Sequence, residues 1–241
     1  EQISGNGFLK KTVEEITAGM TTPEAKLVAI HQYVKQNVQW DGNSRKFISS
    51  SLKKVLDDKK GNSADINLLL ASMLEKAGFE VHPVLLSTRD HGFVRETTPI
   101  SSQFNYVITE VKFGDKFLLV DATDKYLPLG LLPERCLNGN GFLVAKEGYQ
   151  WVKLQATVKS KITSTLDFKI AETGEMKGNI KIDKVGYDAS NTRKNYFTKG
   201  EEEYVKDMIA NRSWEFSKSE FQNTKELGEA FKEAYVADVK E

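Results

Sequence analysis

The chain has 241 residues, of which 39% are hydrophobic and 28% charged, enough apolar material for one large or two small domains. Its 34 basic residues balance its 34 acidic residues, which argues against a general nucleic-acid-binding protein. No apolar run approaches the roughly 18 residues that span a bilayer. A single cysteine, Cys136, excludes internal disulfides and cysteine-cluster metal sites. We expect no cofactor and no metal.

Three helices are predicted in the first third of the chain. Residues 22–24, Thr-Pro-Glu, form a helix start, with a capping hydroxyl, a proline at the first helical position and an acid in the first turn. Apolar residues then recur at helical spacing up to residue 38. A second, short helix is predicted over residues 51–60. The third, between Gly61 and Gly78, is apolar nearly all round, so we expect it to be buried at the centre of a domain.

Strands are predicted to follow this central helix. Residues 79–87 (FEVHPVLLS) have the composition of a strand, and residues 104–123 predict a hairpin around the two-residue turn Gly114-Asp115. If Phe113 pairs with Lys116, then Tyr106 and Asp121 lie on one face as diagonal neighbours. Their backbones would be roughly 7–8 Å apart.

The start of the central helix has the layout of a nucleophile site, with Ser63 at the first turn. The partial positive charge at a helix N-terminus favours a thiolate, so a cysteine enzyme would carry its thiol here. A serine gains little from this position. Its hydroxyl does not ionise, and it needs a base within roughly 3 Å.

Four short motifs support a resemblance to a known family. The chain has GNSAD at 61–65, FNYV at 104–107, DATD at 121–124 and LLPERCLNG at 131–139. Over about residues 21–144 their order and spacing resemble the transglutaminase-like superfamily, which shares its core with papain-type cysteine proteases. The most similar branch is bacterial and secreted or periplasmic, and it has G-D-C-K-D, F-N-H-V, D-P-T-D and L-P-E-R-C-L-N-G at these places.

The resemblance implies an α+β fold in two domains. Residues 1–150 would form a transglutaminase-like, papain-like core, in which helices pack on an antiparallel sheet. Residues 151–241 would form a smaller β-rich domain with one helix. The resemblance also implies an extracytoplasmic location, in the periplasm or cell envelope. Because the chain opens at EQISGNGF without a signal peptide, we expect flanking domains of a longer protein.

The departures from the family fall on its catalytic positions. The resemblance places Ser63 at the nucleophile position, Tyr106 at the histidine position and Asp121 at the position of the orienting acid. Tyrosine titrates near pH 10 and is a poor proton acceptor at neutral pH. Losing one member of such a triad typically costs several orders of magnitude in rate. We therefore interpret the three residues as a degenerate, inactive triad and lean against enzymatic activity.

Four further residues are candidates for lining a groove beside these positions: Trp40, Asn62, Asn105 and His91. Trp40 matches an aromatic residue that lies near the site in the resembling family. His91 lies in the loop RDHGF, which could approach the groove. It is also the best candidate for a recruited base in a serine mechanism.

Three other features have simpler interpretations. We expect His31 at a polar surface position on the first helix and His82 packed or at a sheet edge. Cys136 is interpreted as a buried structural thiol. The alternating glycines of LNGNGF, residues 137–142, predict a turn, because no strand-to-helix pattern surrounds them.

The sequence changes character after residue 151. Apolar and polar residues alternate over 161–170 and 176–183, on either side of a Glu-Thr-Gly turn, which predicts a hairpin with one solvated face. Residues 188–212 predict a helix, and the aromatic residues of 214–221 predict a strand. The last stretch, 223–241, is ambiguous between helix and strand.

Three hypotheses follow. The first is a non-catalytic transglutaminase-like module of a larger envelope-associated bacterial protein, which binds a peptide or glycan or acts as a scaffold. The second is an amide hydrolase or acyl transferase that uses Ser63 with a recruited base. The third is a structural or interaction domain with a filled cleft, in which Ser63 caps the helix and the Tyr106 hydroxyl bonds a neighbour. We expect no nucleic-acid partner and no transmembrane segment.

Overall fold

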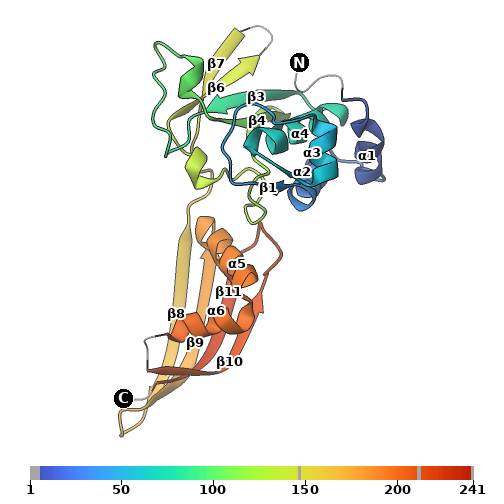
Figure 1. Ribbon diagram of the computed structural model, residues 1–241. Helices are drawn as coiled ribbons and strands as arrows, with labels where there is room; N and C mark the ends of the chain where they lie inside the picture. The colour runs from blue at the N-terminus through green and yellow to red at the C-terminus, as the bar shows by residue number, and fades with distance from the viewer. Residues whose placement is uncertain (1–5, 146–147, 211–212, 240–241) are drawn as a thin grey trace. The chain divides into compact units, whose positions relative to one another are not determined.

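The computed structural model describes residues 6–145, 148–210 and 213–239, which form two units (Figure 1). The first unit contains the residues up to Lys125 together with Leu129–Thr157, and the second contains Tyr126–Pro128 and the residues from Val158 onward. The first unit packs helices on an antiparallel sheet and the second is β-rich. The predicted α+β class is therefore confirmed.

The helices of the first unit are α1 Leu9–Ile16, α2 Pro23–Asn37, α3 Leu52–Asp58 and α4 Ser63–Lys76. The last three occupy the predicted segments. The predicted cap at Thr22 forms, because its hydroxyl accepts a backbone N–H at the start of α2, and the Ser51 hydroxyl caps α3 in the same way. Helix α1 was not predicted; it has two turns and buries only Leu9 and Val13.

The sheet of the first unit has the strand order β5-β4-β3-β6-β7, and all neighbours are antiparallel. Its strands are β3 Val81–Leu86, β4 Tyr106–Phe113, β5 Lys116–Val120, β6 Asn140–Ala145 and β7 Gly148–Lys153. The predicted hairpin register is confirmed, since Phe113 pairs with Lys116. The turn predicted around LNGNGF is wrong in its second half, where β6 begins.

The pairing of β6 with β7 also shifts the boundary between the units. Because β7 extends the first sheet to Lys153, the first unit continues to Thr157, beyond the expected end at residue 150. A short parallel pair, β1 Gln39–Trp40 and β2 Lys60–Gly61, lies outside this sheet. It joins the end of α2 to the start of α4.

Helix α4 lies at the centre of the first unit and packs on β3 and β4. Every residue from Ser63 to Leu74 is buried, as the nearly uniform apolar sequence predicted. Burial of a Leu or Ile side chain contributes about 1.5–3 kcal/mol, so this helix is a main source of stability. The expectation for His31 on α2 was wrong, because its side chain is 3% exposed.

The second unit contains a four-stranded antiparallel sheet with the order β10-β11-β9-β8. Its elements are β8 Lys161–Ile170, β9 Met176–Val185, α5 Tyr187–Lys199, α6 Glu201–Ile209, β10 Trp214–Gln222 and β11 Phe231–Val239. The predicted hairpin and the strand after residue 213 are confirmed, and residues 231–239 of the ambiguous stretch form a strand. Two helices replace the single one expected, because Gly200, with φ +84°, breaks the helical segment.

The helices of the second unit lie over part of its sheet. Helix α5 packs on β9 and β11, and α6 packs on β10 (Figure 1). Among residues 6–145, 148–210 and 213–239, no helix combines the length and apolar character that crossing a membrane requires.

Gly178 provides a test of the second unit. On this β9 residue an added Cβ would lie 2.0 Å from the Asp167 carbonyl oxygen and 2.7 Å from the Phe168 Cα. Both are backbone atoms, so we expect Gly178→Ala to separate β8 from β9 and to cost about 1–3 kcal/mol. Hydrogen–deuterium exchange over β8 and β9 measures this. Gly228→Ala is the matched control, because its Cβ would meet nothing within 4 Å. Equal exchange in both variants would contradict the prediction.

Candidate functional site

A capping box fixes the start of α4. The Asn62 side chain accepts the Asp65 N–H at 2.9 Å, and the Asp65 carboxylate accepts the Asn62 N–H at 2.8 Å. Asp65 also accepts the N–H and the hydroxyl of Ser49, each at 2.7 Å. Asn62 is thus the cap, and Asp65 fastens the loop of residues 41–51 to the helix start.

This loop encloses the hydroxyl of Ser63. The Ser63 Oγ accepts the Arg45 N–H at 2.7 Å and donates to the Arg45 carbonyl oxygen at 2.8 Å. The Ser63 side chain is fully buried, and its N–H donates to the Asn43 carbonyl oxygen at 3.1 Å. A backbone carbonyl is too weak a base to take the hydroxyl proton. In this arrangement Ser63 is a structural bridge.

Tyr106 and Asp121 meet, as the hairpin register predicted. The Tyr106 hydroxyl donates to Asp121 Oδ2 at 2.9 Å. Burial raises the pKa of Tyr106 well above its ordinary value of 10, and the Asp121 carboxylate raises it further. The phenol therefore remains protonated at neutral pH and donates its proton toward the acid. A general base at this position would have to accept one.

Arg135, in the short 3₁₀ turn Glu134–Cys136, completes the group. Its Nη2 donates to the Tyr106 hydroxyl at 3.0 Å and also to Thr123 Oγ1. The guanidinium carbon lies 4.0 Å from the ring centroid of Trp40 and 5.5 Å from that of Tyr106, which is cation–π geometry. Arg135 belongs to the LLPERCLNG motif, and it was not among the predicted site residues. No spacing in the sequence indicated that it would face Tyr106.

Asp121 is held from its other side by α4 and α2. Asn67 Nδ2 donates to Asp121 Oδ2 at 2.7 Å. His31 Nε2 lies 2.9 Å from the Asp121 carbonyl oxygen. Burial, together with the Lys35 cation, lowers the pKa of His31 to about 4, so its ring is neutral and Nε2–H donates. His31 therefore supports the Asp121 backbone, which is why a residue expected on the surface is buried.

The remaining candidates lie in neighbouring structure. His91 is exposed, and its Nδ1 lies 3.0 Å from Ser87 Oγ. Asn105 accepts the Thr88 N–H at 2.9 Å and donates to Thr88 Oγ1 at 2.7 Å, so it fastens the loop after β3. His82, half-buried, lies 3.3 Å from Glu80 Oε1. These contacts engage both histidines away from Ser63, whose hydroxyl is taken up by Arg45.

The sole thiol is inert. Cys136 is fully buried, as predicted. Burial raises its pKa well above the ordinary value, and the nearby Asp121 carboxylate raises it further. In the described parts of the chain no group of three or more His, Cys, Asp or Glu residues could hold a metal ion.

Trp40 connects Ser63 to the group formed by Tyr106, Asp121 and Arg135. Its Nε1 donates at 3.0 Å to the Asn43 carbonyl oxygen, which also accepts the Ser63 N–H. The Arg135 guanidinium packs on the face of the Trp40 ring and donates a hydrogen bond to the Tyr106 hydroxyl. The structure thus joins these positions into one contiguous network. Within this network the Ser63 hydroxyl and the Tyr106 hydroxyl face different partners.

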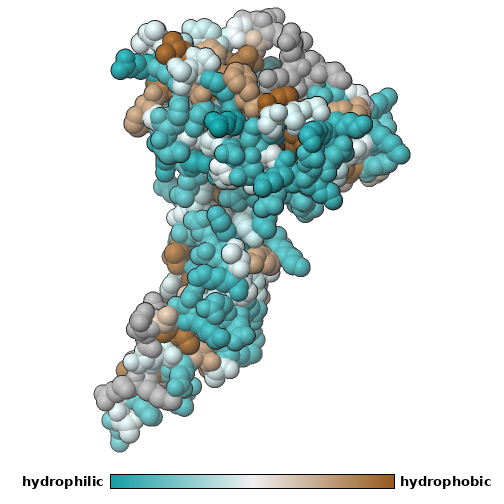
Figure 2. Space-filling model, in the orientation of Figure 1, coloured by the Kyte–Doolittle hydropathy of each residue, from teal (hydrophilic) through white to brown (hydrophobic). Residues whose placement is uncertain are grey.

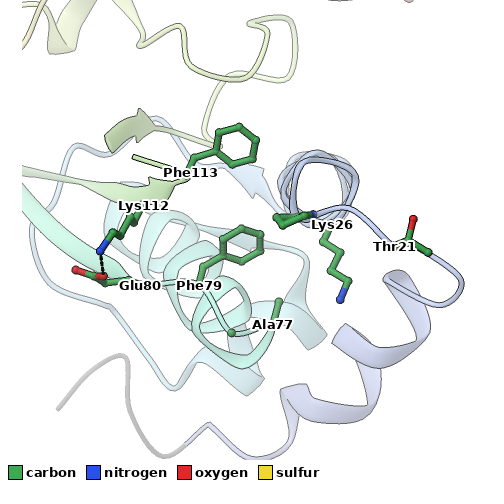
Figure 3. A pocket seen from close by; sticks show the side chains of 10 residues that line it. Thr21, Lys26, Ala77, Phe79, Glu80, Lys112 and Phe113 are labelled. Carbon is green, nitrogen blue, oxygen red and sulfur yellow. Dashed lines mark hydrogen bonds and ion pairs between the residues drawn. The ribbon is translucent and has the colours of Figure 1, made fainter. Parts of the chain in front are cut away.

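A hollow of about 420 Å³ lies at the other end of α4. Figure 3 shows Phe79 and Phe113 beside it, with Lys26 and the Lys112–Glu80 ion pair. Its lining residues are Thr21, Pro23, Lys26, Ala77, Gly78, Phe79, Glu80, Lys112, Phe113 and Gly114. None of the predicted site residues lines it, so it is separate from the Ser63–Tyr106 network.

Comparison with known proteins gives one family model and two solved structures. Residues 10–122 match the family model of the transglutaminase-like superfamily. A candidate cysteine protease from Cytophaga hutchinsonii is 16% identical, with a TM-score of 0.39 over 51% of this chain and 39% of that one. A candidate protease from Parabacteroides distasonis ATCC 8503 is 10% identical, with a TM-score of 0.49 over 100% of this chain and 50% of that one. This chain therefore spans at most half the length of either protein. No curated protein matches it.

The burial of His31 predicts a pH dependence of stability. Between about pH 6.5 and pH 4 the unfolded chain binds a proton that the folded chain does not. The free energy of unfolding should therefore decrease by about 3 kcal/mol as the pH is lowered from about 6.5 to about 4. Urea unfolding at pH 7 and pH 4.5 measures the loss. In His31→Gln this part of the loss should vanish, whereas His91→Gln, at an exposed position, should keep the wild-type dependence. A wild-type profile in His31→Gln would refute the assignment.

Proposed function

We propose that residues 10–122, which match the family model of the transglutaminase-like superfamily, form a catalytically degenerate domain that acts as a binding or scaffolding module. One observation supports this above all others. The hydroxyl at the nucleophile position, Ser63 Oγ, directs its proton to a backbone carbonyl and accepts a backbone N–H. A serine mechanism requires a base at that place.

The tyrosine at the presumed base position supports the same proposal. Its hydroxyl donates to Asp121 and accepts from Arg135, so both of its hydrogen-bonding roles are filled. A fixed cation beside it opposes the arrival of a second proton. Tyr106 would therefore stabilise the network without moving protons.

A surface for a ligand is available next to the enclosed Ser63. Lys46 Nζ bonds the carbonyl oxygen and, at 2.9 Å, the hydroxyl of Ser101, which ties the loop over Ser63 to the loop before β4. The residues adjacent to this contact, Phe47 and Ile100, are 58% and 54% exposed. Exposed apolar side chains on two fastened loops suit contact with a peptide or glycan. We place the binding role of the module here.

The cellular setting belongs to the same proposal. The motif resemblance described above favours a domain of a larger bacterial protein in the periplasm or cell envelope. A chain with one buried thiol is compatible with an oxidising compartment, because the sequence has no second cysteine for that thiol to pair with and burial makes it little reactive.

Ser63→Ala tests the absence of catalysis. We expect wild type and variant to show the same background labelling by a fluorophosphonate probe and the same hydrolysis of a peptide and ester panel. The variant should instead lose about 1–3 kcal/mol of unfolding free energy, because the Arg45 N–H and carbonyl lose their partner. Ser102→Ala, at an exposed position, is the control for stability. Labelling or turnover that depends on Ser63 would favour the hydrolase hypothesis instead.

Phe47→Ser tests the binding role. Wild-type protein is first applied to peptide and glycan arrays to find ligands that it retains. For each such ligand we expect the affinity of the variant to be about tenfold lower, since one buried aromatic contact contributes about 1 kcal/mol or more. Phe117→Ser is matched in exposure, at 53%, and should bind as wild type does. Equal binding by both variants would remove the surface from the proposal, and an empty array would leave scaffolding as the role.

A further inference from the structure

Strand β8 of the second unit has an exposed apolar row. Its residues Ile162, Leu166 and Ile170 are 53%, 57% and 71% exposed. They share one face of the strand, because side chains alternate between the two faces. On that same face Leu166 pairs with the buried Ile180 of β9, which in turn pairs with the buried Tyr235 of β11. The row therefore continues the apolar core of the sheet outward to its edge.

The cover provided by the helices stops before this row. Helices α5 and α6 pack on β9, β11 and β10. Figure 2 shows apolar side chains, in brown, along the border of the second unit that β8 forms in Figure 1. Within the described residues, no strand pairs with the outer edge of β8. Ten residues of regular strand thus present an apolar row and unpaired backbone groups.

The two edges of the sheet differ in how they are protected. The opposite edge, β10, has a register shift between Phe216 and Lys218. A β-bulge of this kind blocks the addition of another strand. Strand β8 pairs with β9 without interruption from Lys161 to Ile170, so its outer edge is regular. The β10 edge is therefore protected against pairing with another strand, and the β8 edge is suited to it.

The sequence of β8 is complementary to itself. In an antiparallel pair of two β8 strands, a two-fold axis at Leu166 places Leu166 opposite Leu166 and Ile162 opposite Ile170. On the other face Thr163 meets Lys169 and Thr165 meets Asp167. Two neighbouring registers also keep each side chain on its own face of the sheet. A two-fold axis at Thr165 places Lys161 opposite Lys169, and one at Asp167 places Asp167 opposite its own copy. Like charges directly opposite one another destabilise a sheet, so the register centred on Leu166 is selected.

We propose that β8 pairs antiparallel with β8 of a second copy of this chain, with Leu166 at the two-fold axis, to form one continuous sheet across a dimer. A symmetric contact of this type is closed and uses the same surface on both copies. Because the three apolar side chains make a small interface, the dimer is of the weak class. The surface lies in the second unit, so the inference does not depend on the role of Ser63.

Sedimentation velocity of the full chain between about 10 µM and 1 mM tests the association, a range suited to weak interfaces. We expect a monomer–dimer equilibrium, and Leu166→Lys should weaken it by about tenfold or more, because two cations would face each other. Phe117→Lys, equally exposed on the edge strand β5 of the other sheet, should dimerise as wild type does. A wild type that is monomeric throughout, or a Leu166→Lys variant that dimerises normally, would overturn the proposal.

Charge reversal tests the register itself. Leu166→Lys and Leu166→Glu should each be monomeric, and their equimolar mixture should form a heterodimer, because residue 166 faces itself only in this register. Leu166→Cys adds a covalent test. Opposed residues in an antiparallel pair have Cα atoms about 4.5–5.5 Å apart, within disulfide range, and the native Cys136 is buried. Absence of both the heterodimer and the cross-link would exclude pairing at Leu166.

Discussion

The first unit depends on a buried carboxylate, that of Asp121. A buried charge is tolerated only where hydrogen-bond donors surround it. Asp121 is 4% exposed, and it accepts hydrogen bonds from Tyr106 on β4, Asn67 on α4 and Thr123 in the loop after β5. The Arg135 cation donates hydrogen bonds to the hydroxyls of two of these residues, Tyr106 and Thr123. One negative charge therefore fixes the central helix, the hairpin and the 3₁₀ turn with respect to one another.

The same interaction limits what the site can do. The Tyr106 hydroxyl donates to Asp121 and accepts from Arg135, so this hydroxyl has no free role in proton transfer. With a phenol between Asp121 and Arg135, each proton has one favourable position. The hydrogen bonds of Tyr106, Asp121 and Arg135 therefore hold β4, the loop after β5 and the 3₁₀ turn together.

The sequence predicted what local chemistry determines. The helix start at Thr22 follows from hydroxyl capping, and the meeting of Tyr106 with Asp121 follows from hairpin register. The features that were missed depend on contacts distant in sequence. His31 is buried because a carbonyl ninety residues away accepts its ring N–H, and Arg135 is drawn in by Trp40 and Tyr106. Neither partnership leaves a periodic pattern along the chain.

The loop over Ser63 has a consequence for any peptide that approaches the helix start. The Arg45 amide and carbonyl present to the Ser63 hydroxyl the same pair of groups that a bound peptide would present. The chain therefore supplies its own occupant, tethered by fewer than twenty residues. A tether of that kind gives an effective concentration in the millimolar range. A peptide from outside would have to displace Arg45 before its own backbone could bond the Ser63 hydroxyl.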